Sequence, residues 1–317
     1  HTQTGLVGCC SIDDYFNNTI KKHELTRPDK EEDRKNHVRY SALNYEAVFL
    51  SYPQVTGIDQ LVNITKKEKH LYDFISDDDI RHRLWAITNK EILRKITALF
   101  KTKVPKIYIA DGHHRTAAGA LVGKEFRDSR NGNLDDKKRD NYFMAVVFPD
   151  NQLKILDYNR VVKDLNGFTK NELIQRLKNK FDVVTCATQY RPESLHTFGM
   201  YLEGQWYKLS SLPDSYDDSD PIGQLDVTIL SKNVLEPIFD IIDLRKDIRI
   251  DFVGGMRGLS ELEKRVDSGD MKVAFSMYPV SMTQLINISD NDLLMPPKVT
   301  WFEPKLRSGL FIHDLTD

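Results

Sequence analysis

Residues 106–122 restrict the fold of this chain more than any other stretch, because the sequence changes there from strand-like to helix-like across one glycine. Residues 106–110, Lys-Ile-Tyr-Ile-Ala, are apolar and β-prone and predict a short buried strand after Pro105. Residues 113–122 are rich in alanine and predict a helix. The intervening Asp111-Gly112 predicts a tight turn, since glycine adopts backbone angles that strain other residues.

The first turn of this predicted helix carries His113, His114 and Arg115. Backbone N–H groups at a helix start lack intrahelical partners and attract anions, so a guanidinium and two imidazoles there predict a phosphate cradle. Asp111, at the strand end, is a candidate to hold a metal ion or a substrate hydroxyl. The alternative is that Asp111 is only the helix N-cap and that the histidines are surface residues.

A polar loop near the start of the chain is the second candidate region. It lies between a predicted strand at 5–11 and a predicted helix at about 28–44, which Thr26 is expected to cap. His23 and Glu24 in this loop carry groups that can bind or move protons. The residues alone leave a functional role and a solvent-exposed role equally open.

The remaining periodicity and turn signals predict alternating strands and helices without repeats. Polar loops are expected at 77–79, three aspartates in a solvated turn, and at 128–140. A capping box of Thr169 and Glu172 should begin a helix. The expected strands and hairpins are 47–52, 71–75 with 81–87, 142–148 with 153–162, 183–185, 197–210, 248–254, 273–278 and 309–315. The expected helices are 58–65, 89–101, 169–181, 225–239, 259–266 and 282–294.

Composition places the chain among ordinary globular proteins. It has 317 residues, of which 40% are hydrophobic and 29% charged, and a formal net charge of −2. Neither this charge nor any basic tract indicates a polyanionic partner, and no apolar run approaches the ~20 residues that cross a bilayer. Three cysteines make no disulfide framework, which fits a reducing cytoplasm, and Cys9-Cys10 are expected to be buried. The chain starts at His1 close to a strand, so we expect an upstream segment to be missing.

Several common motifs are absent from the sequence. Gly119 to Lys124 has three residues, not four, before Gly-Lys and lacks the Ser or Thr of a P-loop. Gly254 to Gly258 is glycine-rich but is not a dinucleotide fingerprint. No Gly-x-Ser-x-Gly elbow and no Cys-x-x-Cys pair occurs.

Three passages resemble motifs of the free L-serine kinases of the ParB/sulfiredoxin superfamily, in the same order along the chain. They are 23–25 (His-Glu-Leu), 109–115 (Ile-Ala-Asp-Gly-His-His-Arg) and 297–300 (Pro-Lys-Val-Thr). The whole chain also resembles the family catalogued as domain of unknown function 1015 (DUF1015), which carries Asp-Gly-His-His-Arg and a C-terminal Pro-Pro-Lys run.

These resemblances imply an α+β fold, with a ParB/sulfiredoxin-like mixed sheet and helices and an additional α/β subdomain. We expect residues 1–165 to form the nucleotide-binding domain and 166–247 an inserted or second α/β subdomain. Residues 248–317 are expected to be a C-terminal α/β segment that completes the substrate site.

The kinase resemblance implies transfer of phosphate from ATP or ADP to the hydroxyl of free L-serine, with Mg²⁺ as cofactor. It implies that Glu24 and Asp111 are catalytic, with Glu24 taking the serine proton. The implied nucleotide-binding residues are Gly112, His113, His114, Arg115 and Thr116. The implied substrate-binding residues are His23, Lys298 and Thr300, although Val299 stands where the kinases have a threonine.

Two other activities compete with this interpretation. A ParB-like module that binds CTP or ATP as a switch would need no turnover, but the helix-turn-helix pair and basic face of DNA-binding ParB proteins are missing. Sulfiredoxin-like repair would need a cysteine where His113 and His114 stand. The expected partners are therefore a nucleotide and a small hydroxyl compound, with no nucleic acid and no membrane.

Overall fold

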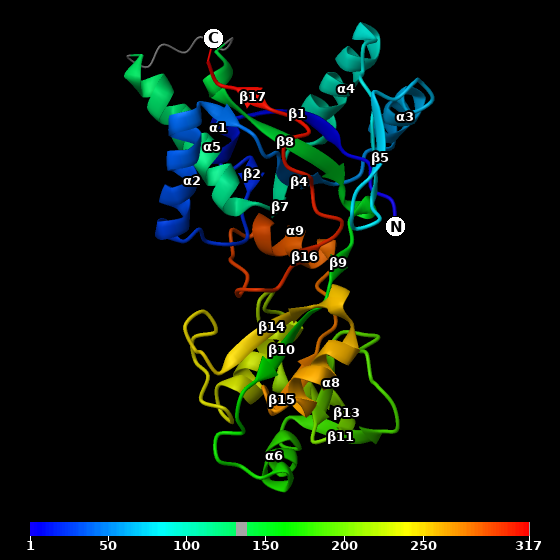
Figure 1. Cartoon of the computed structure of the whole chain (residues 1–317), viewed down its shortest axis with the longest axis vertical. Helices are drawn as coiled ribbons and strands as arrows, with labels where there is room; N and C mark the ends of the chain where they lie inside the picture. The colour runs from blue at the N-terminus through cyan, green and yellow to red at the C-terminus, as the bar shows by residue number, and fades with distance from the viewer. Residues whose placement is uncertain (131–137, 317) are drawn as a thin grey trace. The chain divides into compact units, whose positions relative to one another are not determined.

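The computed structural model describes residues 1–130 and 138–316. These residues form two compact units, one of residues 1–153 with 304–317 and one of residues 154–303, called here the first and the second unit. Figure 1 shows the course of the chain and the element labels. Of the polar loop expected at 128–140, residues 131–137 lie outside the described residues.

The first unit is built on a mixed five-stranded sheet in the order β1-β8-β4-β7-β2. β1 pairs antiparallel with β8 and β4 antiparallel with β7, whereas β4–β8 and β2–β7 are parallel. The mixed sheet expected from the sequence is thus confirmed. The strands are β1 (Leu6–Ser11), β2 (Ile20–Lys21), β4 (Val48–Tyr52), β7 (Ile107–Asp111) and β8 (Tyr142–Pro149).

Helices and two small strand pairs complete the first unit. β5 (Tyr72–Ile75) pairs with β6 (Arg81–Leu84), as predicted, and β17 (His313–Asp314) pairs with β3 (Leu43–Asn44). The strand expected over 309–315 is therefore shorter than predicted. The helices are α1 (Ile12–Phe16), α2 (Pro28–Ser41), α3 (Thr56–Thr65), α4 (Lys90–Lys103) and α5 (His113–Ser129), with 3-10 turns at Arg139–Asn141 and Asp150–Gln152.

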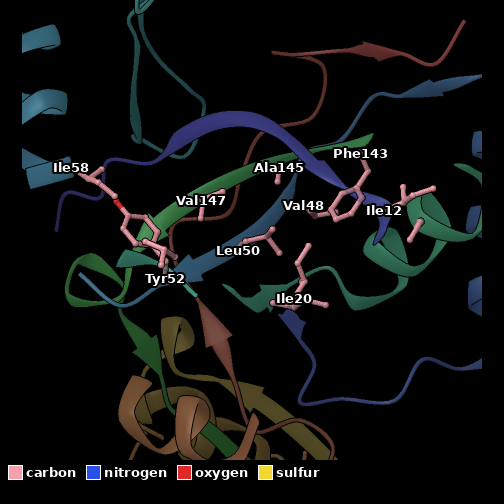
Figure 2. Close-up of a cluster of buried hydrophobic side chains, with 12 residues drawn as sticks. Ile12, Ile20, Val48, Leu50, Tyr52, Ile58, Phe143, Ala145 and Val147 are labelled. Carbon is pink, nitrogen blue, oxygen red and sulfur yellow. The ribbon is translucent and has the colours of Figure 1, made fainter. Parts of the chain in front are cut away.

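Apolar side chains from the sheet form the core of the first unit. Figure 2 shows Val48, Leu50 and Tyr52 of β4 in one cluster with Ala145 and Val147 of β8. β4 is buried at every position, which explains its run of apolar residues.

Small residues let α5 pack closely on its neighbours. Ala117, Ala118 and Ala120 are completely buried, and α5 lies beside α2 (Figure 1). A Cβ atom on Gly123 would lie 2.3 Å from the carbonyl oxygen of Asp140, so only glycine fits there.

The second unit contains an antiparallel six-stranded sheet in the order β11-β13-β12-β15-β10-β14. Its strands are β10 (Tyr158–Val162), β11 (Phe181–Cys186), β12 (Thr197–Leu202), β13 (Gln205–Ser211), β14 (Ile250–Gly254) and β15 (Val273–Ser276), and a separate pair joins β9 (Ile155–Leu156) to β16 (Trp301–Phe302). The helices are α6 (Lys170–Leu177), α7 (Asp226–Leu230), α8 (Leu259–Asp267) and α9 (Met282–Asp290), with 3-10 turns at Pro213–Ser215 and Gly255–Arg257.

Several local predictions are confirmed in the second unit, and one is not. Thr169 and Glu172 form the expected capping box of α6, and the hairpin of β12 and β13 turns at residues 203–204. The single helix expected over 225–239 is wrong: α7 ends at Leu230, and a π-helical turn, Ser231–Leu235, follows.

Two further predictions fail, one because of distant strand partners and one because of a local hydrogen bond. The hairpin expected from 142–148 and 153–162 does not form, since β8 pairs with β1 and β4 and β10 pairs with β14 and β15. The predicted Thr26 cap is also wrong. Arg27 is the N-cap of α2, and the Thr26 hydroxyl donates to Glu31 at 2.6 Å instead.

The two units group the chain differently from the three domains expected from the sequence. The observed boundary lies at 153/154, and residues 304–317 belong to the first unit. β12, from the expected subdomain 166–247, and β15, from the expected segment 248–317, are neighbours in one sheet, and β15 also pairs with β10. The two expected domains therefore share a single sheet. Cys9, expected to be buried, is exposed, and all three cysteines are free thiols.

Candidate active site

The predicted strand, turn and helix around Gly112 are confirmed as β7, Gly112 and α5. Gly112 is the N-cap of α5, with φ of +92°, no side-chain cap bond and no acidic residue in the first helical turn. The alternative in which Asp111 caps the helix is therefore wrong. An uncapped start of a 17-residue helix presents backbone donors and the positive end of the helix dipole.

Arg115 folds back over this turn. Its Nη1 atom donates to Glu46 Oε2 at 3.1 Å and to the Ala47 carbonyl at 3.4 Å, and its Nη2 atom lies 4.0 Å from Asp111 Oδ2. A Cβ atom on Gly112 would approach the Arg115 guanidinium to 3.0 Å. Glycine at 112 thus provides both the left-handed backbone and the space for this cation.

Asp111 has a second cationic neighbour. Lys305 Nζ donates to Asp111 Oδ2 at 3.0 Å, across 194 residues of sequence. Asp111 is about one-third exposed, so its carboxylate faces solvent between two cations. Lys305 and Glu46 were missed by the sequence analysis, because neither belongs to a local motif.

The His-Glu loop lies against the first turn of α5. Glu24 Oε2 is 3.8 Å from His113 Nδ1, and the rings of His23 and His113 meet edge to face with centroids 4.4 Å apart. The His23 backbone N–H donates to His113 Nε2 at 3.5 Å. Glu24 is less than half exposed and lies beside His113. The His-Glu motif at 23–25 and the motif at 109–115 therefore form one cluster.

Burial controls the charge of both histidines. It lowers the pKa of His23 to about 4, against a smaller opposing effect of Asp111, and neither ring nitrogen of His23 has a hydrogen-bond partner. Burial also lowers the pKa of His113 well below 6.5, with smaller contributions from His23, His114 and Lys22. Both imidazoles are neutral at pH 7, and His113 is not the surface residue that the alternative interpretation required.

Two predicted nucleotide-binding side chains have partners within the protein. His114 Nε2 accepts a hydrogen bond from the Arg27 backbone N–H at 2.9 Å. The Thr116 hydroxyl is buried and donates to the Gly112 carbonyl at 3.0 Å. These contacts anchor the helix start to the loop before α2 and to its own cap.

The first unit therefore brings together the predicted site residues 23, 24 and 111–116. Lys298 and Thr300 lie in the second unit. Lys298 is exposed with a positive φ of 57°, and its carbonyl accepts a hydrogen bond from the buried Arg160 at 3.0 Å. The substrate-binding roles of Lys298 and Thr300 stay predictions.

The carboxylates suit one kind of magnesium site. The described residues contain no group of three His, Cys, Asp or Glu side chains that could hold a metal ion by themselves. In kinases, Mg²⁺ is commonly held by one or two carboxylates together with substrate phosphates. If Mg²⁺ binds together with phosphates, Asp111 and Glu24 are the carboxylates of this cluster that would hold it.

The structure is that of a mixed α/β protein in which an uncapped helix start lies beside the acidic side chains of Asp111 and Glu24. The family described as "Protein of unknown function (DUF1015)" matches residues 1–228, and the chain belongs to this family, as the sequence predicted. No curated protein matches the chain in sequence. Across residues 1–130 and 138–316, no helix has the length and apolarity required to span a membrane.

Several solved structures are similar to this chain. A mutant free serine kinase in complex with AMP is 12% identical, with a TM-score of 0.47 over 100% of this chain and 93% of that chain. SbnI with a C-terminal truncation, from Staphylococcus aureus, is 12% identical, with a TM-score of 0.46 over 97% and 87%. A conserved hypothetical protein from Pyrococcus furiosus is 13% identical, with a TM-score of 0.44 over 99% and 97%.

Proposed function

We propose that this protein is a small-molecule kinase that transfers phosphate from ATP or ADP to the hydroxyl of free L-serine. The observation that carries the proposal is the position of Asp111, whose carboxylate lies 3.0 Å from Lys305 and 4.0 Å from Arg115 at an uncapped helix start. Phosphoryl transfer requires positioning, cationic charge on the phosphates and a carboxylate near the attacking hydroxyl.

In this proposal the phosphates rest on the start of α5. The backbone N–H groups of residues 113–115 lie at the N-terminus of α5, where they would donate to phosphate oxygens. Arg115 and Lys305 supply positive charge beside them. Phosphate oxygens would compete with Asp111 for both cations, which frees the Asp111 carboxylate for Mg²⁺ or for the serine hydroxyl. When bound, Mg²⁺ would neutralise charge on the phosphates.

Glu24 is the proposed base. The serine oxygen forms a bond to the terminal phosphorus, the bridging P–O bond breaks, the proton passes to Glu24, and ADP or AMP leaves. The proposed base lies 3.8 Å from His113, and because burial lowers the pKa of that histidine, the neighbouring ring is uncharged at pH 7. His23, Lys298 and Thr300 are the proposed contacts of the amino acid.

A phosphorus NMR panel tests this function. The full chain is incubated with Mg²⁺ and either ATP, ADP or CTP, with L-serine, L-threonine or no acceptor. We expect O-phosphoserine only where L-serine is present with ATP or ADP. Nucleotide binding by calorimetry without a phosphorylated acceptor in any mixture would overturn the kinase and favour a nucleotide-binding switch.

A further inference from the structure

The hairpin of β5 and β6 exposes more apolar surface than a solvated hairpin needs. Leu71, Tyr72, Phe74 and Ile75 are 59%, 56%, 37% and 65% exposed. Within the described residues, β5 pairs with β6 alone, so its other edge has no strand partner. Figure 1 shows β5 in the first unit. Free edges of this kind are usually protected by charged residues, Pro or a bulge. Residues 71–75 contain no Lys or Pro, and their one charge, Asp73, is paired with Arg81 of the same hairpin. The Leu71 N–H donates to the Leu84 carbonyl at 2.7 Å, so the free backbone donors of this edge begin within β5.

The sequence of β5 together with the preceding Leu71 is self-complementary. Residues 71–75 are Leu-Tyr-Asp-Phe-Ile, so the order aliphatic, aromatic, Asp, aromatic, aliphatic is the same in both directions. If two copies pair antiparallel with Asp73 at the centre, Leu71 of each copy lies opposite Ile75 of the other. Tyr72 then lies opposite Phe74 of the other copy. Aliphatic and aromatic cross-strand pairs of this kind stabilise sheets.

The flanking charges are complementary in the same register. Lys69 lies in the loop before β5 and Asp77 in the hairpin turn after it, so antiparallel pairing about Asp73 brings Lys69 of one copy to the strand end where Asp77 of the other lies. The two Asp73 carboxylates at the centre are each neutralised within their own hairpin. Arg81 donates to both Asp73 oxygens at 2.7 Å and lowers the pKa of that carboxyl.

The opposite edge of the hairpin lacks this complementarity. β6 begins Arg81-His82-Arg83, and antiparallel self-pairing centred on His82 would place Arg81 opposite Arg83 of the second copy. Like charges directly opposite each other destabilise a strand pair. The exposed large hydrophobic residues of the hairpin also lie at 71–75 and none lies on β6, so β5 is the edge that gains from being covered.

We propose that two copies of this chain form a two-fold symmetric dimer in which their β5 strands pair antiparallel about Asp73. The dimer would join the two hairpins into one four-stranded sheet and cover the exposed apolar residues of β5. In such a two-fold symmetric interface, each contact occurs two times, once from each copy. The inference concerns association and is independent of the proposed kinase activity.

Sedimentation equilibrium of the full chain over a concentration series tests the dimer. Ile75→Asp should raise the dimer dissociation constant by about 30-fold or more, since the substitution acts twice across the axis. The matched control is Ile248→Asp, which changes an isoleucine that is 87% exposed in the second unit, and it should leave the constant within about twofold. A native chain that is monomeric throughout, or a dimer that Ile75→Asp leaves intact, would overturn the proposal.

A charge swap tests the register without altering the apolar strand. Lys69→Asp and Asp77→Lys, each alone, bring like charges to the same end of the paired strands and should weaken the dimer by about three- to tenfold. The double variant K69D/D77K restores opposite charges and should return to within about threefold of the native constant. If the double variant is no tighter than the single variants, the proposed register is wrong. Circular dichroism of each variant verifies folding, and this swap decides the question if Ile75→Asp does not fold.

Discussion

The imidazole of His23 packs edge to face against that of His113, with ring centroids 4.4 Å apart and an interplanar angle of 87°. One ring comes from the loop after β2 and the other from the first turn of α5. This contact places the adjacent Glu24 at the helix start that follows Asp111. Two motifs of the sequence therefore meet through a buried, uncharged pair of rings rather than through an ion pair.

Acid should weaken the fold through this pair. In the unfolded chain His23 binds a proton near pH 6.5, whereas burial lowers its pKa to about 4 in the folded chain. The unfolded state thus binds more protons between these values, so the stability contribution is fully present above about pH 6.5 and is lost as the pH falls toward 4. We expect His23 alone to reduce the free energy of unfolding by about 1–2 kcal/mol between pH 7 and pH 5.

Urea unfolding at a series of pH values measures this dependence. His23→Phe should give a flatter curve than the native chain between pH 5 and pH 7, and the same substitution at the exposed His37 is the matched control. Superimposable slopes for the native chain and His23→Phe would show that His23 titrates normally in the folded state.

Glu24→Gln should reduce kcat of the proposed kinase by about 10²- to 10⁴-fold, because the amide cannot accept the serine proton. Nucleotide affinity should be mostly kept, since Glu24 contacts His113 rather than the phosphate-facing backbone. Steady-state kinetics and calorimetry on the same preparations separate the two effects. Glu91→Gln, on α4 and paired with Lys95 at 2.8 Å, is the control. An equal collapse of binding would mean that Glu24 is structural.

Arg115→Ala should weaken nucleotide binding by about 1.5–3 kcal/mol, the usual contribution of a hydrogen bond to a charged group. The guanidinium also holds Glu46 at 3.1 Å, so calorimetry should be done below the unfolding transition of the variant. Arg94→Ala, an exposed arginine on α4, should leave the affinity unchanged. An Arg115→Ala variant that binds as tightly as the native chain would remove Arg115 from the phosphate site.

Lys305→Met tests a residue that the sequence motifs did not include. Loss of the ammonium 3.0 Å from Asp111 should lower nucleotide affinity by about tenfold, because one of two cations at the helix start is removed. Lys95→Met, which breaks a comparable pair with Glu91 on α4, is the matched control. Equal affinities for both variants in calorimetry would restrict Lys305 to a structural role.

Gly123→Ala should destabilise the chain by about 1–3 kcal/mol, although alanine normally favours helices. The added Cβ would lie 2.3 Å from the Asp140 carbonyl oxygen, and backbone there cannot move aside cheaply. Gly8→Ala is the control, since nothing lies within 4 Å of its Cβ position. Thermal unfolding measures both, and an unchanged midpoint for Gly123→Ala would contradict the close packing of α5.

The sequence alone determined the features that depend on neighbouring residues. The turn at Gly112 requires a left-handed backbone, and only glycine adopts it without strain, so the strand and the helix on either side could be predicted. The Thr169–Glu172 capping box and the hairpin turn at 203–204 follow from spacings of a few residues. Each of these signals is complete within one short stretch of chain.

Only the tertiary structure decided the features that join distant residues. Local sequence could not give the partners of β8, because its apolar run suits any buried position between two strands. The ion pair of Lys305 with Asp111 and the contact of Arg115 with Glu46 form because the C-terminal segment and the residue before β4 return to the helix start. The neutrality of His23 and His113 likewise results from burial, which depends on how the whole unit packs around them.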